Sequence, residues 1–371
     1  MKKITILALH DGVGGAEKYI SLLCQMLNEE FKIEIIFTYR SKNKIYDFPK
    51  AKIKYLINDI SNRKEFIDSL KKHNWIKCLK EGLKSLKLLY LKRNLNIKAI
   101  KNSESDYIIT TRAFHNKLVG KYAPKKALKI ATEHNHHNNE KKYIKKTLRC
   151  IKNLDYFVLV SKELYEFYKD KTNIKCLYIP NTYDIKIDEK SKLNSDKLIS
   201  VGRLSPEKGY LDLIEVMKKV NEQDNEIEIN LIGDGPQREL IVKKIRDYNL
   251  ENKVHLLGFL NSNEIAKILK DSTLFIMTSY TESFGIVLLE AMEAGVVPIA
   301  FDSAQGACEV LEEDKDLLIP NRDINLMTEK ILYYLKHKDM LKEKVLINNE
   351  RKNKYTLKEV KKKWLNLLEK R

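Results

Sequence analysis

Two glutamates near the end of the chain, Glu282 and Glu290, stand with seven residues between them at the start of a predicted helix. The apolar run 274–277 before them is typical of a buried strand, and residues 284–294 have helical composition up to Gly295. The start of a helix binds anions through its free backbone N–H groups. A carboxylate beside a bound phosphate would repel it. We therefore expect these acids to accept hydrogen bonds from hydroxyl groups, such as those of a sugar nucleotide.

The donors at this predicted helix start are backbone groups. Ser283 is a favoured N-cap residue, and the N–H groups of Phe284, Gly285 and Ile286 would point toward an anion. Spacing alone also fits an ordinary amphipathic helix with two solvated glutamates. The flanking residues and the other motifs decide between these two interpretations.

Three further turns follow predicted strands and could contact the same kind of ligand. Arg203 and Lys208 flank the turn 202–209, where two cations could meet a diphosphate. The turn Gly233-Asp234-Gly235-Pro236 and the loop containing Gly14 and Gly15 would let the backbone approach a ligand closely. Taken singly, each is explained equally well by surface charge or by turn geometry.

Together these motifs resemble the retaining glycosyltransferases of family 4. The resemblance lies in Glu-Ser-Phe-Gly with its second glutamate, in Gly-Arg-Leu-x-x-x-Lys-Gly at 202–209, and in the Gly-x-Gly-Pro turn. It extends over nearly all of residues 4–368. It implies an α/β protein of GT-B fold, with two facing doubly wound, Rossmann-like domains and an active site in the cleft between them. It also implies sugar transfer from a nucleotide-sugar, here expected to be a UDP-sugar, with the anomeric configuration retained.

The resemblance assigns a role to each matching residue. Glu282 would bind the transferred sugar and Glu290 the ribose. Arg203 and Lys208 would stabilise the departing diphosphate, and His134 would face the donor sugar. The residues expected at the donor are Gly14, Gly15, Arg203, Lys208, Gly233, Gly235, Glu282, Ser283, Phe284, Gly285, Ile286 and Glu290.

The histidines after Glu133 raise the possibility of a zinc site. His136 and His137 are adjacent, however, and neighbouring histidines chelate one ion poorly. Their contribution to the site stays open. We see no Asp-x-Asp site in the sequence either. Since two cations and a helix start could neutralise the diphosphate, we expect neither a metal nor another cofactor.

The length and periodicity indicate two domains. Apolar strands alternate with helical segments from Ile4 onward, and the same pattern begins again near Leu198. We predict an acceptor-binding domain at 1–182, a linker at 183–196, a donor-binding domain at 197–353 and a last helix at 354–371 that crosses back to the first domain. Five scattered cysteines are typical of a reduced, cytoplasmic protein.

Positive charge is concentrated in the first half of the chain. Residues 1–190 hold 40 Lys and Arg against 21 Asp and Glu, whereas residues 191–371 hold 29 against 30. Residues 62–102 are predicted to be mostly helical, and residues 71–101 within them carry ten cations and one acid, interleaved with leucines. This pattern fits a helix on an anionic membrane and, equally, a solvated surface helix. No apolar run approaches the roughly 20 residues that span a bilayer.

These observations predict a peripheral enzyme on the inner face of the cell membrane, which extends a lipid-linked saccharide for a surface polysaccharide. A soluble acceptor and a sugar-nucleotide epimerase are the alternatives within the same fold. A nucleic-acid-binding protein would explain the charge alone. No binding module accompanies that charge, and the basic residues stand among leucines rather than stacking aromatics. We therefore expect no nucleic-acid partner.

Overall fold

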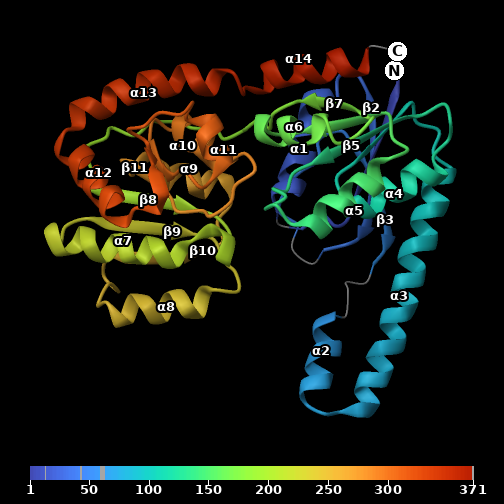
Figure 1. Cartoon of the computed structure of the whole chain (residues 1–371), viewed down its shortest axis with the longest axis horizontal. Coiled ribbons are helices and arrows are strands. Elements are labelled where there is room, and N and C mark those ends of the chain that lie inside the picture. Colours follow the sequence, from blue (N-terminus) through green and yellow to red (C-terminus); the bar gives the residue numbers. More distant parts are fainter. Residues whose placement is uncertain (13, 42–43, 59–62, 370–371) are drawn as a thin grey trace. The chain divides into compact units, whose positions relative to one another are not determined.

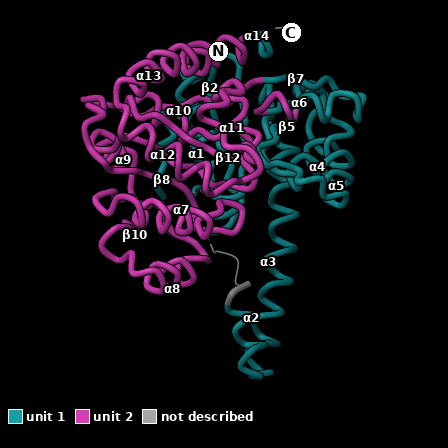
Figure 2. Tube along the Cα trace, turned by 60° about the vertical axis from the view of Figure 1, so that its left-hand side comes forward, with its two compact units in different colours: residues 1–159, 165–178, 366–371 teal, residues 160–164, 179–365 magenta. Residues whose placement is uncertain are grey.

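The chain forms two compact units. The computed structural model describes residues 1–12, 14–41, 44–58 and 63–369. Unit 1 contains Met1–Leu159, Tyr165–Tyr178 and the chain from Asn366, and unit 2 contains Val160–Leu164 and Ile179–Leu365 (Figure 2).

Unit 1 is built on a parallel sheet of seven strands in the order β3-β2-β1-β4-β5-β6-β7 (Figure 1). Apolar side chains cover both faces of its central strands, as expected for a sheet with helices on either side. The strands are β1 (Lys3–Ala8), β2 (Lys32–Tyr39), β3 (Lys52–Ile57), β4 (Tyr107–Thr110), β5 (Leu128–Glu133), β6 (Tyr156–Leu159) and β7 (Lys175–Tyr178). The helices are α1 (Gly15–Leu27), α2 (Arg63–Lys71), α3 (Trp75–Lys101), α4 (Ala113–Tyr122), α5 (Lys141–Ile151) and α6 (Lys162–Lys169).

The basic segment predicted as mostly helical over 62–102 forms a hairpin of α2 and α3; residue 62 lies outside the described part. The chain turns at His73, whose φ is 50°, and Asn74 then caps α3 by accepting a hydrogen bond from the Lys77 N–H at 3.0 Å. α2 and the first half of α3 project away from the sheet of unit 1 (Figures 1 and 2). None of the described helices is long and apolar enough to cross a bilayer.

Unit 2 contains a parallel sheet of six strands in the order β10-β9-β8-β11-β12-β13. These are β8 (Lys197–Val201), β9 (Glu228–Ile232), β10 (Val254–Gly258), β11 (Leu274–Met277), β12 (Val297–Phe301) and β13 (Leu318–Ile319). The helices are η1 (Pro206–Lys208), α7 (Tyr210–Gln223), α8 (Arg238–Asp247), α9 (Ser262–Lys270), α10 (Ile286–Glu293), α11 (Gln305–Val310), η2 (Pro320–Arg322), α12 (Ile324–Lys336), α13 (Lys338–Asn353) and α14 (Leu357–Leu368), the last of which ends in unit 1.

The two sheets confirm the predicted doubly wound α/β class. In unit 1 the strand order reverses between the neighbours β1 and β4, and in unit 2 between β8 and β11. Ligands of such sheets bind at the carboxyl ends of the strands next to that reversal. The turns after β1, β4, β8 and β11 are therefore the places to look for a site. They include the loop of Gly14 and Gly15 and the turn 202–209. They also include Glu282, the first glutamate of the signature formed by Glu-Ser-Phe-Gly and its second glutamate, Glu290.

Candidate functional site

In unit 2, the turns that follow β8 and β11 pack directly against each other. The Tyr280 N–H donates to the carbonyl of Glu207 at 2.8 Å, and the Thr278 hydroxyl donates to the carbonyl of Lys208 at 3.3 Å. Gly209 has a φ of 65°, and a Cβ there would lie 2.0 Å from the Thr278 carbonyl oxygen. A side chain at 209 would force the two turns apart. This explains the glycine that closes the 202–209 motif.

The same two turns bring Lys208 and Glu282 together as an ion pair. Their side chains are 24% and 17% exposed, so a ligand can reach both charges. Arg203 is the second cation predicted to meet the diphosphate. Its side chain is exposed, and no carboxylate of the described residues lies within ion-pair distance of it. A small pocket beside the turns is lined by Ser200, Val201, Lys208, Tyr210, Phe275, Met277, Thr278 and Ser279.

The helix of the signature begins later than the sequence predicts. α10 starts at Ile286, and its N-cap is Gly285 with a φ of 86° and no side-chain cap. The prediction that Ser283 caps this helix is therefore wrong, because the chain takes a left-handed conformation at Gly285 before it becomes helical. Phe284 is 1% exposed and packs edge-on against Tyr355, with ring centroids 5.2 Å apart. It anchors the turn that presents the N–H group of Ile286.

The two glutamates of the signature lie in different environments. Glu282 belongs to the turn, and its carbonyl accepts the Gly306 N–H at 2.8 Å. Glu290 lies in the second turn of α10 and is only 4% exposed. A buried carboxylate is stable only when it is hydrogen-bonded or paired. Glu290 is thus held in a fixed position, whereas Glu282 can exchange its partner for a ligand.

Gly233 and Gly235 are required by packing within unit 2. A Cβ on Gly233 would lie 1.9 Å from the Gly202 carbonyl oxygen, and one on Gly235 would lie 2.4 Å from that of Leu204. The Leu204 N–H also donates to the Asp234 carbonyl at 3.1 Å. The turn after β9 therefore fits tightly on the turn after β8. Contact of these glycines with a nucleotide stays a prediction.

Arg322 supports the turn after β11, although no sequence motif singles it out. Its guanidinium donates to the carbonyls of Thr278 at 2.9 Å and Ser279 at 3.0 Å, and to the Ser303 hydroxyl at 2.9 Å. It also forms an ion pair with Asp212. These partners lie far apart in the sequence, so no local motif could have revealed them.

In unit 1, a buried carboxylate lies at the point where the strand order reverses. Glu17 is 2% exposed and faces the Arg112 guanidinium at 3.8 Å and the His10 ring at 3.6 Å. A Cβ on Gly14 would lie 2.2 Å from the Glu17 carboxylate, whereas nothing lies within 4 Å of a Cβ on Gly15. Gly14 therefore makes room for Glu17. Arg112, which follows β4, is a further cation of this site that the sequence analysis did not identify.

His134 stands directly after β5, and its ring is fixed by two neighbours. Its Nε2 atom lies 2.8 Å from the Thr132 hydroxyl oxygen, and the Tyr19 ring centroid lies 4.2 Å away. The Thr132 hydroxyl donates its proton to the Thr110 carbonyl at 3.2 Å. With the Thr132 proton on that carbonyl, Nε2 of His134 is the donor to Thr132 and Nδ1 is an acceptor. Burial, assisted by Arg112, lowers the pKa of His134 to about 3.

Buried neutral histidines make unit 1 sensitive to acid. Burial, followed by the charges of Lys92 and Arg112, lowers the pKa of His115 to about 3. In the unfolded chain a histidine binds a proton near pH 6.5, so the unfolded state takes up more protons between about pH 6.5 and 3. We expect the free energy of unfolding to fall as the pH is lowered through this window. Urea unfolding of wild type and His115→Gln at pH 7 and 5 checks this. An equal pH dependence in both proteins would contradict the assignment.

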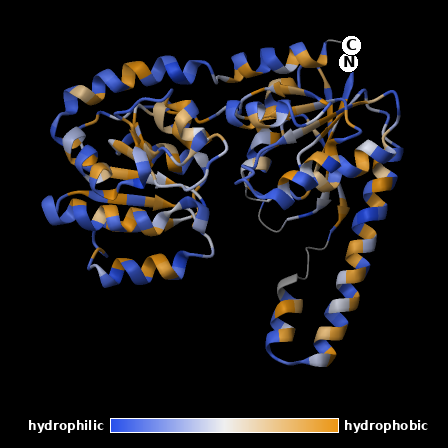
Figure 3. Ribbon diagram, in the orientation of Figure 1, coloured by the Kyte–Doolittle hydropathy of each residue, from blue (hydrophilic) through white to orange (hydrophobic). Residues whose placement is uncertain are grey.

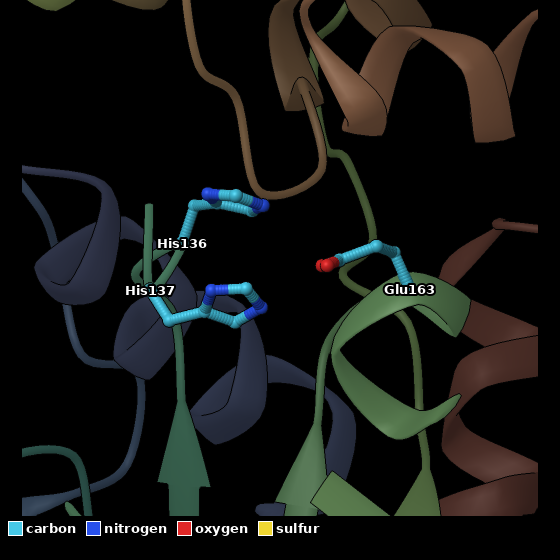
Figure 4. Close-up of side chains that lie close together, drawn as sticks. All are labelled: His136, His137 and Glu163. Carbon is cyan, nitrogen blue, oxygen red and sulfur yellow. The ribbon is translucent and has the colours of Figure 1, made fainter. Parts of the chain in front are cut away.

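One group among the described residues could hold a metal ion. One ring nitrogen each of His136 and His137 and one carboxylate oxygen of Glu163 lie within 4.8 Å of one another (Figure 4). The Nδ1 atom of His137 accepts the Asn139 backbone N–H at 3.0 Å, and the Nδ1 atom of His136 lies 3.0 Å from the Asn138 backbone nitrogen and 2.6 Å from its Oδ1 atom. The His137 ring also stacks on Phe167 with centroids 3.7 Å apart. These contacts give both rings a role in shaping the loop after β5.

An Asp-x-Asp triplet does occur, at Asp314-Lys315-Asp316, so the expectation that the sequence has none is wrong. Lys344 donates to the carboxylates of Asp314 and Asp316 at 3.1 Å each, and Arg351 donates to Asp314 at 3.0 Å. Burial raises the pKa of Asp314, but these cations outweigh that effect and hold the pKa below its usual range. The triplet is thus neutralised by protein cations and lies outside the turns described above.

The geometry of each unit indicates what it can bind. Unit 2 offers two cations, Lys208 and Arg203, a helix start at Ile286 and the carboxylates Glu282 and Glu290 within one set of packed turns. Cations and N–H groups bind phosphate, and carboxylates bind hydroxyl groups. Unit 1 offers a neutral imidazole at His134. Within unit 2, the structure therefore places the predicted residues after β8, β9 and β11 in one set of turns.

Comparison with known proteins finds one matching family and relatives that are glycosyltransferases. Residues 183–353 match the family "Glycosyl transferases group 1". A poly(ribitol-phosphate) alpha-N-acetylglucosaminyltransferase of Staphylococcus aureus is 33% identical over 189 residues, which are 49% of this chain and 38% of the relative. The chain thus spans well under two thirds of that relative's length. A Campylobacter jejuni N-acetylgalactosamine-N,N'-diacetylbacillosaminyl-diphospho-undecaprenol 4-alpha-N-acetylgalactosaminyltransferase is 25% identical over 332 residues, which are 85% of each chain.

Solved structures share the fold over its whole length. S. aureus TarM, crystallised with fondaparinux, alpha-GlcNAc-glycerol and UDP, superposes with a TM-score of 0.79 at 19% identity and covers 99% of both chains. Sucrose-phosphate synthase from Thermosynechococcus elongatus gives a TM-score of 0.75 at 16% identity over 100% of this chain and 98% of that one. The predicted GT-B fold is confirmed.

Proposed function

We propose that this chain, in which residues 183–353 match the family "Glycosyl transferases group 1", transfers a sugar from a nucleotide-sugar to a lipid-linked saccharide with retention of anomeric configuration. The observation that carries this proposal is the ion pair between Lys208 and Glu282. It joins a cation suited to a diphosphate to a carboxylate suited to sugar hydroxyls.

The donor is proposed to be a UDP-sugar. TarM, which has the same fold, was crystallised with UDP. The diphosphate would take Lys208 from Glu282 and contact Arg203 and the N–H of Ile286. Glu282 would then accept hydrogen bonds from the sugar, and Glu290 from the ribose. Gly14 and Gly15 would lie at the donor, and the neutral His134 would accept a hydrogen bond from a sugar hydroxyl through Nδ1.

The proposed reaction needs no enzymic nucleophile. An acceptor hydroxyl oxygen forms the new bond to the anomeric carbon on the face from which the diphosphate leaves. The bond between that carbon and the diphosphate oxygen breaks, and the hydroxyl proton passes to the leaving phosphate. Lys208 and Arg203 stabilise the negative charge that develops there, which is the largest contribution expected from such a site.

A lipid-linked acceptor is supported by the charge distribution. Unit 1 contains most of the basic first half of the chain, and a cytoplasmic leaflet is anionic. The Campylobacter relative is named for an undecaprenol-linked acceptor. We propose that the chain works at the inner face of the membrane as a peripheral enzyme. Thermal-shift screening against UDP-, GDP- and dTDP-sugars tests the donor, and failure of every nucleotide-sugar to raise the melting temperature would overturn it.

Removal of divalent metal is expected to leave turnover nearly unchanged. The proposed charge neutralisation uses Lys208, Arg203 and a helix start, and the Asp-x-Asp triplet is already paired with Lys344 and Arg351. The measurement is the initial rate of UDP release with and without EDTA. Loss of activity that magnesium or manganese restores would show that the leaving-group chemistry is misassigned. His137→Ala would then test whether the group in Figure 4 holds the ion.

A further inference from the structure

The α2–α3 hairpin carries a stripe of apolar side chains that unit 1 leaves exposed. In α3 the stripe consists of Ile76, Leu79, Leu83, Leu86 and Tyr90, which are 61–85% exposed. Their spacing of three and four residues places them on one face of the helix. Trp75, at the start of α3, is 69% exposed. Of the seventeen large apolar side chains exposed in the described structure, nine lie between residues 67 and 90. Such clustering marks a binding surface rather than scattered surface residues.

This stripe is not the face that holds the hairpin together. α2 packs on another side of α3, where a Cβ on Gly82 would lie 3.4 Å from the Phe66 ring. The buried residues of α3 are Leu88, at its midpoint, and Asn96 and Ile100, in its second half. The second half therefore anchors the helix in unit 1, and the first half presents its apolar stripe on the projecting hairpin. Figure 3 shows apolar and polar residues alternating along this part of α3.

A parallel stripe of lysines accompanies the apolar one. Each of the first four apolar residues is followed directly by a lysine, at Lys77, Lys80, Lys84 and Lys87. Since neighbouring residues of an α-helix are about 100° apart, these lysines form one row beside the apolar stripe. None of the four is ion-paired with a carboxylate of the described residues.

We propose that the first half of α3 lies in the headgroup region of an anionic bilayer, with its apolar stripe facing the acyl chains and its lysine row on the lipid phosphates. Helices with this division of faces bind such surfaces. Pairing with a second copy would bring lysine rows of like charge together, which opposes association. The inference deepens the proposed membrane location and does not depend on sugar transfer. It differs from purely electrostatic docking, because the apolar stripe would hold the protein at high salt.

The chain contains its own reporter for this contact. It has two tryptophans, and Trp364 is fully buried whereas Trp75 is 69% exposed at the start of the stripe. Adding phosphatidylglycerol vesicles to the full chain is expected to shift its tryptophan emission to shorter wavelength. Trp75→Phe should abolish the shift and leave the emission of Trp364. No shift in the wild type would overturn the proposal.

Two sets of variants separate the two stripes in vesicle sedimentation. Leu79→Ser with Leu83→Ser is expected to weaken binding by at least about tenfold and to abolish it at high salt. The control is Leu346→Ser in α13, because Leu346 and Leu79 are both 68% exposed. Charge reversal to glutamate at Lys71, Lys72, Lys77, Lys80 and Lys84 should abolish binding to anionic vesicles.

Other outcomes would overturn the proposal. Vesicle binding by the leucine variants as strong as that of the wild type would contradict it. Equal binding to vesicles of phosphatidylcholine alone would contradict it as well. A dimer in sedimentation velocity that Leu83→Ser converts to monomer, with Trp75 already shielded, would show that a second copy covers the stripe. Transfer to an unanchored saccharide should be the same in all variants. If the wild type also transfers no sugar to an unanchored saccharide, that result argues against the proposed activity and leaves the vesicle result standing.

Discussion

Replacing Lys208 by alanine is expected to slow sugar transfer by at least about a hundredfold, the loss typical when one group that stabilises the developing charge is removed. Lys208 would contribute a positive charge to the departing diphosphate, and Arg203 alone would remain. The fold should persist, because the contacts that join the two turns use the backbone of Lys208 and of Glu207. The measurement is kcat for UDP release at saturating donor, together with the melting temperature.

A closely matched lysine supplies the control. Lys330 lies in the same unit, is also 24% exposed, and pairs with Asp316 at 3.0 Å. Lys330→Ala removes a similar ion pair away from the proposed site, so its transfer rate should stay within about twofold of the wild type while any loss of stability is comparable. A Lys208→Ala enzyme with the rate of the Lys330→Ala enzyme would remove Lys208 from the proposed site.

The second large effect is expected at Glu290. If this carboxylate accepts hydrogen bonds from the ribose, Glu290→Ala should lower kcat/KM by about 10- to 100-fold, the equivalent of a lost hydrogen bond to a charged group. The effect should appear chiefly as a higher KM for the donor. Glu290→Gln keeps the side-chain volume in this buried position, and it separates loss of the ligand contact from loss of packing.

Glu293 provides the comparison on the same helix. It pairs with Lys352 and accepts a hydrogen bond from the Tyr183 hydroxyl at 3.0 Å. Glu293→Gln should therefore affect the melting temperature and leave the donor KM unchanged. An unchanged donor KM in both Glu290 variants would mean that the buried carboxylate only stabilises α10.

Local patterns in the sequence predicted most of the strands near the site. β11 has the predicted bounds, because the short apolar run 274–277 is delimited by the polar residues Thr273 and Thr278. The start of α10 was misplaced by two residues. Serine is a good N-cap in general, but here the left-handed conformation of Gly285 delays the helix. That conformation is set by the surrounding turns, since Gly306 packs against the backbone of Phe284.

Contacts between distant segments could not be predicted in this way. Arg322 supports the turn after β11 from the far end of the sheet, and Arg112 meets Glu17 only because β1 and β4 are neighbours. The break between α2 and α3 was missed as well. His73 takes a left-handed φ there, and the helical composition of the segment gives no sign of it.

The most direct test of the account is to follow the donor and acceptor together. Wild-type enzyme, a UDP-sugar that stabilises it and a lipid-linked saccharide are incubated, and both UDP and the glycosylated lipid are quantified. Equal amounts of UDP and product are expected, with the anomeric configuration of the donor retained. A sugar nucleotide that is isomerised without glycoside formation, or a product of inverted configuration, would contradict it.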